Sequence, residues 1–231
     1  MADRNGPDGN GSKLCRALIL IGPPGAGKGT QAKTIASRLG VPHISTGDMF
    51  RELIGRRTPL GEKARPFMDS GELVPDDVVL EMVQERVSRD DCSNGFILDG
   101  FPRTVPQAQK FDEIVRKRHL MDPFVIHFVV DTKLLLRRLT GRRTCSVGGE
   151  IYNIYDRPPK VPGRCDNDGG ELIQRPDDRE EIITGRLSTY EARTEVLVDY
   201  YRRKGKVVDL DAMAPPPVVT NHLLKVLALA Q

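Results

Sequence analysis

Short apolar runs alternate with amphipathic stretches along most of this chain. The apolar runs occupy residues 17–21, 96–98, 124–130 and 207–210, and stretches with a helical period lie at 28–39, 133–139 and 218–229. Runs this short and this apolar are typical of strands that are buried on both faces. Their alternation with helices predicts an α/β fold in which helices cover both faces of a parallel sheet.

Three segments do not follow this alternation. Residues 45–74 are mostly polar with a helical pattern, and residues 141–178 are rich in Gly, Pro, Cys and Tyr with short alternating runs. We expect the first to form a helical excursion from the sheet and the second a small β-rich flap. Residues 1–12 have almost no apolar side chains to bury, so they are predicted to be a disordered tail.

The overall composition is that of an ordinary globular protein. Of 231 residues, 39% are hydrophobic and 29% are charged, and 35 basic residues against 32 acidic ones leave a net charge of +3. This length allows one compact domain with insertions. A charge this balanced gives no reason to expect binding to nucleic acid or to a membrane through bulk electrostatics.

Neither a membrane span nor an export signal is evident. The run at 17–21 is far too short to cross a bilayer, and no small-residue cleavage site follows it. Four cysteines in a chain of this length do not make a disulfide scaffold, so Cys15 and Cys92 are expected to be buried as small apolar residues. We therefore expect a cytoplasmic protein.

A glycine-rich loop follows the first predicted strand directly. Its sequence is GPPGAGKGT at residues 22–30, in which Gly22, Gly27 and Lys28 have the spacing of a phosphate-binding P-loop. The glycines let backbone amides approach a phosphate, the next helix adds its positive end, and the lysine adds a mobile charge. The alternative is a plain glycine-rich turn, but the strand before the loop and the helix after it favour nucleotide binding.

One position departs from the general P-loop motif. Gly29 follows the lysine where most P-loop proteins place the Ser or Thr that binds magnesium, and Thr30 comes one residue later. We therefore expect Mg²⁺ to be held mainly by nucleotide oxygens and water, with help through water from Asp99 at the end of the next strand.

Five motifs occur in order along the chain. They are GPPGAGKGTQA at 22–32, STGDMFR at 45–51, LDGFPRT at 98–104, GRR at 141–143 and QRPDD at 174–178. Together they resemble the adenylate kinase family in its long-lid form, and the resemblance runs from about Arg16 to the C-terminus. It implies a P-loop kinase fold with a five-stranded parallel sheet flanked by helices. It also implies reversible transfer of a phosphoryl group from Mg²⁺-ATP to AMP, giving two ADP.

The resemblance also divides the chain. It implies a core of residues 13–44, 75–140 and 179–231, an AMP-binding insert segment at 45–74, and a lid segment at 141–178 that covers ATP. These two segments coincide with the helical excursion and the β-rich flap. The family further implies a monomer whose ligands are ATP, AMP and ADP.

The site residues implied by the resemblance fall into two sets. On the ATP side it implies Gly25, Ala26, Gly27, Lys28, Gly29 and Thr30 around the phosphates, Arg138 beside the base, and Arg142, Ile151 and Tyr152 closing over the nucleotide. On the AMP side it implies Thr46, Arg51, the backbone of Glu72, Leu73 and Val74, and Gly100, Phe101, Pro102, Arg103 and Gln107. In this set Arg103 holds the phosphate and Gln107 contacts the adenine edge. Arg175 and Arg186 are implied to converge on the transferred group.

The basic members of these sets suit the chemistry. The AMP phosphate is already an anionic nucleophile and needs no strong general base. The implied catalytic residues supply positive charge and alignment around the equatorial oxygens instead. They are Lys28, Arg103, Arg142, Arg175 and Arg186.

Other titratable residues receive no catalytic role. Asp177 and Asp178 follow Arg175 and have two interpretations: they orient the arginines, or they form a solvated acidic turn before a helix that starts near Arg179. The four histidines show no partner spacing, and His127, within the apolar run PFVIHFVV, is predicted to be a packed core residue.

The lid segment contains an incomplete metal motif. In zinc-bearing relatives two turns carry four ligands, and Cys145, Cys165 and Asp168 match three of these positions. Gly148 occupies the fourth, whereas structural zinc sites are almost always closed by four protein ligands. The sequence therefore favours a metal-free lid, with a water-completed Zn²⁺ site as the alternative and a Cys145–Cys165 disulfide only under oxidation.

Three other functions compete with this interpretation. A kinase for another nucleoside monophosphate would share these motifs, although Thr46, Gln107 and the long lid favour AMP. A nucleotide-dependent switch would hold magnesium through a hydroxyl residue at position 29, which is glycine. A zinc-ribbon nucleic-acid binder rests on the lid cysteines alone, and the arginine pairs at 137–138 and 142–143 lack interleaved aromatics.

Overall fold

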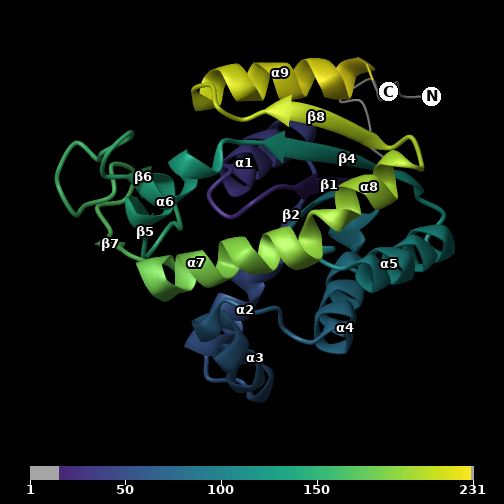
Figure 1. Cartoon of the computed structure of the whole chain (residues 1–231), viewed down its shortest axis with the longest axis horizontal. Helices are drawn as coiled ribbons and strands as arrows, with labels where there is room; N and C mark the ends of the chain where they lie inside the picture. Colours follow the sequence, from purple (N-terminus) through teal and green to yellow (C-terminus); the bar gives the residue numbers. More distant parts are fainter. Residues whose placement is uncertain (1–15, 230–231) are drawn as a thin grey trace, which may run out of the picture.

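The computed structural model describes residues 16–229, so Cys15 and the tail predicted for residues 1–12 lie outside the described residues. The large sheet consists of β1 (Arg16–Ile21), β2 (His43–Ser45), β3 (Phe96–Asp99), β4 (Met121–Val129) and β8 (Val207–Asp211) (Figure 1). Its strand order is β2-β3-β1-β4-β8, and every neighbouring pair is parallel. The predicted α/β fold with a five-stranded parallel sheet is confirmed.

Helices surround this sheet. The α-helices are α1 (Lys28–Leu39), α2 (Thr46–Gly55), α3 (Pro59–Ser70), α4 (Asp76–Val87), α5 (Val105–Lys117), α6 (Thr132–Thr140), α7 (Glu180–Thr189), α8 (Val196–Arg202) and α9 (Pro216–Leu229). Short 3-10 turns lie at η1 (Asp90–Cys92) and η2 (Pro176–Asp178), and a π-helical turn, η3 (Tyr190–Thr194), joins α7 to α8.

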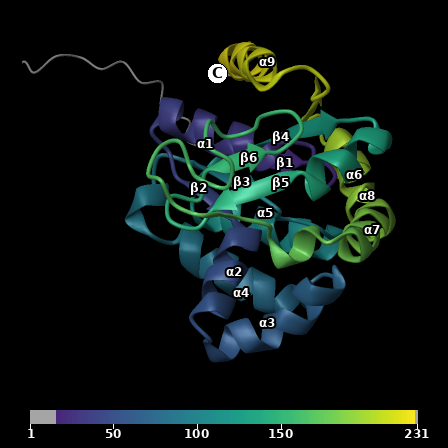
Figure 2. The same cartoon turned by 90° about the vertical axis from the view of Figure 1, so that its left-hand side faces the viewer.

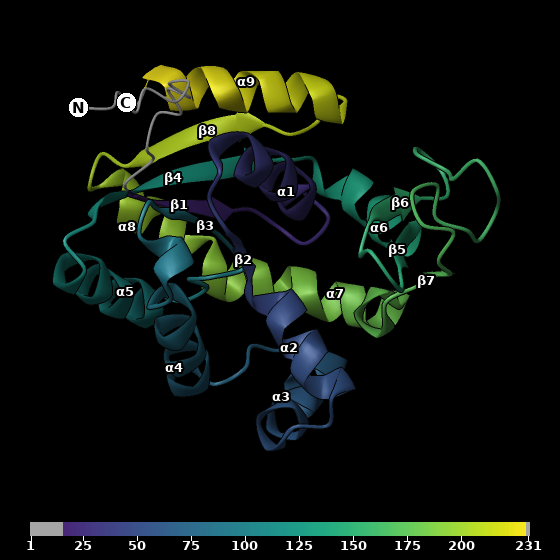
Figure 3. The ribbon, with the colours of Figure 1, turned by 180° about the vertical axis from the view of Figure 1, so that it is seen from behind.

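The alternation of side chains along β1 divides the core into two layers. Ala17, Ile19 and Ile21 pack into the cluster that contains residues of α4, α5 and α8. Leu18 and Leu20 pack into the cluster that contains residues of α1 and α9. The view from behind places α1 and α9 on one side of the sheet and α4, α5 and α8 on the other (Figure 3). Helices therefore cover both faces of the sheet, as the apolar runs predict.

The insert segment forms α2 and α3, which project from the edge of the molecule below the sheet (Figure 1). The two helices touch through their backbones, because a Cβ atom at Gly61 would lie 2.3 Å from the carbonyl oxygen of Leu53. Any larger residue at position 61 would push the helices apart. The helical pattern of this segment is confirmed.

The lid segment forms the second, smaller sheet. Its strands β5 (Arg142–Cys145), β6 (Ile151–Asn153) and β7 (Leu172–Ile173) pair antiparallel in the order β6-β5-β7. Figure 2 shows β5 and β6 next to each other. A cluster of four buried side chains holds it together: Cys145, Tyr152, Cys165 and Leu172. The β-rich flap predicted from composition is confirmed.

Two local predictions have different outcomes. Cys92 is fully buried, as expected. The prediction of a packed core position for His127 is wrong, because its side chain is partly exposed and its Nδ1 lies 2.8 Å from Asp209 Oδ1 on the neighbouring strand. That neighbour, β8, is an edge strand, so the two side chains reach solvent together. None of the helices within residues 16–229 combines the length and apolar character that a bilayer crossing requires.

Candidate active site

A cavity of about 1170 Å³ opens at the carboxyl ends of β1 and β3. Ligands of open α/β sheets bind at this end of the strands, where successive loops diverge. Its walls come from the glycine-rich loop, the insert segment, the lid segment and the start of α9. Residues from all five sequence motifs therefore meet around one space.

The glycine-rich loop turns sharply into α1. Gly25 and Gly27 have φ angles of 83° and 88°, which side chains with a Cβ rarely adopt. Gly27 is the N-cap residue of α1, and no side chain caps the helix there. The first amides of α1 are thus left for an anionic ligand, which the positive end of the helix also favours.

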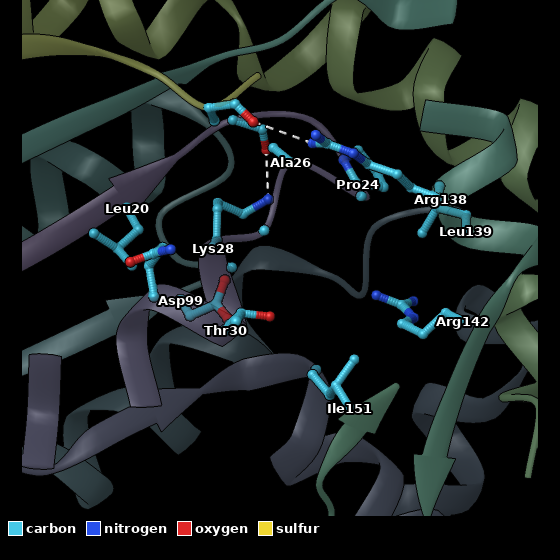
Figure 4. Close-up of a pocket in the computed structure, with 18 of the residues that line it drawn as sticks. Leu20, Pro24, Ala26, Lys28, Thr30, Asp99, Arg138, Leu139, Arg142 and Ile151 are labelled. Atoms are coloured by element: carbon cyan, nitrogen blue, oxygen red, sulfur yellow. Dashed lines mark hydrogen bonds between the residues drawn. The ribbon is translucent and has the colours of Figure 1, made fainter. Parts of the chain in front are cut away.

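Lys28 is the first residue of α1, and its side chain reaches back to the start of this loop (Figure 4). Its Nζ donates to the carbonyl oxygens of Gly22 at 2.7 Å and Pro23 at 2.9 Å. The pKa of Lys28 is lowered from 10.5 to about 8, chiefly by burial; the charge of Asp99 opposes the shift, and the charges of Arg103 and Arg186 add to it. An anion in the cavity would relieve this cationic crowding and favour the charged lysine.

Two buried aspartates orient two of the predicted arginines. Arg142 donates to both carboxylate oxygens of Asp178, at 2.7 and 2.5 Å. Arg186 donates to Asp178 Oδ1 at 3.1 Å and to the carbonyl oxygen of Asp177 at 2.7 Å. Although burial opposes it, the pKa of Arg142 is raised, because Asp178 and Asp177 stabilise its charge. Asp178 is fully buried, so the interpretation of this pair as a solvated acidic turn is wrong.

A second group of charges joins the insert segment to the lid segment. Arg51 in α2 lies 2.6 Å from Asp48 and 3.4 Å from Asp177. Arg175 donates to Thr144 Oγ1 at 2.9 Å and lies 3.8 Å from Asp48. Burial alone would raise the pKa of Asp48, but Arg51 and Arg175 hold it at about 2. The sequence motifs contain Asp48, yet reasoning from them missed it, because its role depends on an arginine from a distant segment.

Arg103 and Asp99 complete the charged wall. Arg103 donates from Nε to the carbonyl oxygen of Gly100 at 2.8 Å, and burial lowers its pKa to about 10. Burial would raise the pKa of Asp99, but His43, whose Nε2 lies 3.5 Å away, and Lys28 lower it. A Cβ atom at Gly29 would lie only 3.1 Å from Asp99 Oδ2. The glycine at position 29 therefore leaves room for this ionised carboxylate.

A smaller cavity of about 30 Å³ adjoins the large one on the insert side. Several predicted AMP-side residues line it: Thr46, Glu72, Leu73, Val74, Gly100, Arg103 and Gln107. Thr46 Oγ1 donates to the carbonyl oxygen of Gly100 at 2.9 Å. Phe101 lies in the core with its ring edge-on to Phe111, so its side chain is directed away from both cavities. Pro102 lines the large cavity.

The predicted ATP-side residues of α6 and the lid face the glycine-rich loop across the large cavity (Figure 4). Arg138 donates to the carbonyl oxygen of Ala212 at 3.2 Å. Arg138 lies in α6 and Arg142 in β5, and α6 ends between them. Ile151 and Tyr152 both line the large cavity. Tyr152 is buried, and its hydroxyl accepts from the amide of Asp166 at 2.8 Å.

The same wall contains residues that no motif or pattern in the sequence singles out. Residues 212–217 and Asn221 line it next to Arg138. Their side chains are mostly small or apolar, and no motif marks them. Only their place in the fold, after the edge strand β8, brings them to the cavity.

Comparisons with known proteins identify the same family that the five sequence motifs resemble. The family model for adenylate kinase matches residues 20–206. The chain is 48% identical over 210 residues to an adenylate kinase of Thermodesulfovibrio yellowstonii, covering 91% of this chain and 98% of that relative. It is 50% identical over 194 residues to adenylate kinases of Archaeoglobus fulgidus and Bacillus subtilis, covering 84% of this chain and 89% of each relative.

Proposed function

Because this chain belongs to the adenylate kinase family, we propose that the charged residues of the large cavity perform the family's reaction in the roles assigned above. The reaction is the reversible transfer of a phosphoryl group from Mg²⁺-ATP to AMP, giving two ADP. One observation carries the assignment of roles. The five predicted catalytic side chains, Lys28, Arg103, Arg142, Arg175 and Arg186, line a single cavity that extends from the glycine-rich loop to the insert segment.

The chemistry requires charge and alignment. An oxygen of the AMP phosphate attacks the terminal phosphorus of ATP, a new P–O bond forms, and the bond to the bridging oxygen of ADP breaks. Guanidinium groups that are already oriented by Asp177 and Asp178 can stabilise the charge that spreads over the equatorial oxygens. Holding both nucleotides in line removes most of the entropic barrier.

Magnesium fits the residues present. Asp99 lines the large cavity as an ionised carboxylate, and it would hold Mg²⁺ through water. When bound with ATP, the ion neutralises phosphate charge. The side chains that line the cavity bind and orient the nucleotide phosphates and shield them from water.

The insert and lid segments take separate parts in this proposal. The insert segment binds AMP through Thr46 and Arg51 of α2, together with Gln107 of α5 in the core. The lid segment covers ATP. Besides the contacts of Arg186 with Asp177 and Asp178, Lys33 in α1 joins the core to the lid segment, because its Nζ donates to the carbonyl oxygen of Gly149 at 2.7 Å.

We further propose a cytoplasmic monomer without nucleic-acid or membrane partners. Cys92, Cys145 and Cys165 are free thiols, which suits a reducing compartment. The +3 net charge also gives no bulk attraction to polyanions. Light scattering of the purified protein should return the mass of one chain, and a dimer mass at micromolar concentration would contradict the monomer.

An AMP-dependent assay tests the proposal directly. We expect rapid ADP formation from ATP plus AMP, and slow ATP hydrolysis without AMP, because closure of the lid and insert segments over the nucleotides would exclude water. A nucleotide switch would hydrolyse ATP slowly whether or not AMP is present. Faster turnover of UMP, CMP or GMP than of AMP at equal concentration would assign the enzyme to a different acceptor.

A two-headed ligand tests whether the cavity holds both nucleotides at once. An analogue that joins two adenosines through five phosphates should bind much more tightly than AMP, because one molecule occupies both sites. Calorimetry gives both affinities on the same protein. Equal affinity for the analogue and for AMP would refute the two-site cavity.

The pH dependence should report Lys28. Its folded pKa of about 8 lies below the ordinary 10.5, so the free enzyme loses this positive charge as the pH rises through about 8. We expect kcat/KM for ATP to fall about tenfold per pH unit above that point, since kcat/KM reports the free enzyme. Bound phosphates favour the charged lysine, so kcat should stay nearly flat. A kcat/KM that is constant up to about pH 10 would rule out this role for Lys28.

We propose that the lid segment works without zinc. Cys145 Sγ lies 3.2 Å and 3.4 Å from the two oxygens of Asp168 and accepts the amides of Val147 and Gly148 at 3.4 Å. The candidate ligand atoms of Cys145, Cys165 and Asp168 all lie within 4.8 Å of one another. This geometry suits three ligands of a tetrahedron, but a fourth protein ligand is missing at Gly148.

Gly148→Cys should therefore create a tight zinc site. The new Cβ would lie 2.6 Å from Asp168 Oδ2, the end of an exposed side chain that can move aside. We expect one zinc per chain and a melting temperature that rises with zinc and falls with chelator, because metal binding adds to folding free energy. Gly148→Ser, which adds a side chain without a thiolate, should show neither effect. One zinc per wild-type chain that is lost in Cys145→Ser would overturn the metal-free lid.

A further inference from the structure

The side-chain amide of Gln107 lies in the wall of the small cavity and is held there by two hydrogen-bond partners. Gln107 is 1% exposed and lines this cavity. Its Oε1 accepts the backbone N–H of Arg103 at 2.8 Å, and its Nε2 donates to Asp76 Oδ1 at 2.7 Å. Both ends of the amide are therefore occupied before any ligand binds.

Asp76 is itself fixed by a second contact. Its Oδ2 accepts the hydroxyl of Thr104 at 2.8 Å, and this hydroxyl oxygen accepts the amide of Gln107 as the N-cap of α5. The carboxylate at the start of α4 thus joins that helix to α5, which carries Gln107. Its position depends on the fold of both helices.

These partners determine which way the amide of Gln107 faces. A backbone N–H can only donate, and a carboxylate can only accept. If the amide turned over, its oxygen would face the carboxylate of Asp76 and its NH₂ group would face the N–H of Arg103. Both contacts would then be repulsive and two buried polar groups would lose their hydrogen bonds, which is costly.

The fixed amide of Gln107 offers a base one arrangement of hydrogen-bond donor and acceptor. Oε1 retains one lone pair and Nε2 retains one hydrogen, by the inventory of an amide that already makes one bond at each end. The adenine edge carries a donor at its 6-amino group and an acceptor at N1. A 6-oxopurine carries the reverse, an acceptor at O6 and a donor at N1, so it requires the amide in the opposite orientation.

We infer that Asp76 is a positioning residue that sets the base specificity of the acceptor site: by holding the Gln107 amide in one orientation, it admits adenine and rejects 6-oxopurine monophosphates. This inference rests on the proposed contact of Gln107 with the adenine edge. Asp76 itself touches no substrate. Its negative charge allows only one orientation of the Gln107 amide, and this orientation discriminates between adenine and a 6-oxopurine.

Asp76→Asn tests the inference, because asparagine can present either its oxygen or its NH₂ group to Gln107. With ATP as donor, kcat/KM is measured for AMP and for inosine monophosphate. We expect the AMP-to-inosinate ratio to fall at least about tenfold, mainly through KM, with kcat for AMP nearly unchanged since the phosphate side is untouched. The matched control is Asp77→Asn, which removes the same charge from the next, exposed position of α4 and should leave the ratio unchanged.

A purely structural role would give a different result. A loosened helix pair would lower kcat/KM for both substrates together and leave their ratio in place, so an unchanged ratio in Asp76→Asn overturns the inference. Gln107→Leu separates this failure from that of the proposed function. If Gln107→Leu also leaves the ratio and the KM for AMP unchanged, Gln107 does not contact the base, and the proposed AMP site is wrong at that residue. If Gln107→Leu changes the ratio and Asp76→Asn does not, only the role of Asp76 fails.

Discussion

Replacing Arg142 by lysine is expected to lower kcat at least about 10²-fold while changing the KM for ATP only a few-fold. The planar fork of Arg142 is held by both oxygens of Asp178, so its remaining donors have a fixed direction in the cavity. A lysine supplies a point charge on a flexible stem and cannot make two parallel hydrogen bonds. The expected loss is that of one preorganised donor to the transition state. Steady-state kinetics with varied ATP at saturating AMP measures it.

Arg143→Lys is the matched control for this prediction. Arg143 is the next residue of β5, and it donates to the backbone carbonyl of Thr140 at 3.0 Å, whereas Arg142 is the one that lines the large cavity. Its replacement should leave kcat within a few-fold of wild type. An Arg142→Lys enzyme that keeps a similar rate would contradict the role of Arg142 in the transfer step.

Asp178→Asn is expected to lower the free energy of unfolding by about 3–5 kcal/mol, the range measured when one partner of a buried ion pair is removed. The carboxylate is fully buried and accepts from both Arg142 and Arg186, so its loss leaves two partly buried cations without that counter-ion. In a protein of this length the melting temperature should fall by roughly 10 °C. Thermal unfolding followed by circular dichroism measures the change.

A second measurement ties this loss to the site. The phosphates of ATP would supply the negative charge that the variant lacks, so saturating ATP should raise the melting temperature of Asp178→Asn more than that of wild type. Asp199→Asn is the control, because that carboxylate is 68% exposed and its contact with Arg202 is 3.6 Å long. It should change stability by less than about 0.5 kcal/mol. If Asp178→Asn has the same melting temperature as wild type, the ion pairs of Asp178 contribute little to the free energy of unfolding.

The sheet could be predicted because its central strands are buried on both faces and read as continuous apolar runs. The run at 17–21 became β1, the middle strand of the sheet. The strand β2 escaped prediction, because His43–Ser45 is too short to show a period. His127 was misplaced for a related reason, since sequence reveals the apolar run around it but not that its neighbour β8 forms the edge.

Some residues of the candidate site could be predicted from the sequence, and others could not. Lys28 could be chosen from the sequence because the glycine-rich loop has a recognisable spacing, and Arg142 because the GRR motif resembles that of the adenylate kinase family. The meaning of Asp178 could not, since a solvated turn and a buried counter-ion have the same sequence and differ only in burial. Asp76 carried no signal either. Its contact with Gln107 spans 31 positions and exists only because α4 and α5 pack together.

We expect the small core of the lid to set the upper temperature at which this enzyme can work. Only four side chains form its buried cluster, while Val147 and Val161 remain 75% and 59% exposed. Local opening should therefore cost much less than global unfolding, and amide hydrogens of the lid should exchange with solvent long before those of the parallel sheet. On heating, turnover should stop while the sheet is still intact. Adaptation of such a chain to a hotter environment would gain most from changes within residues 141–178.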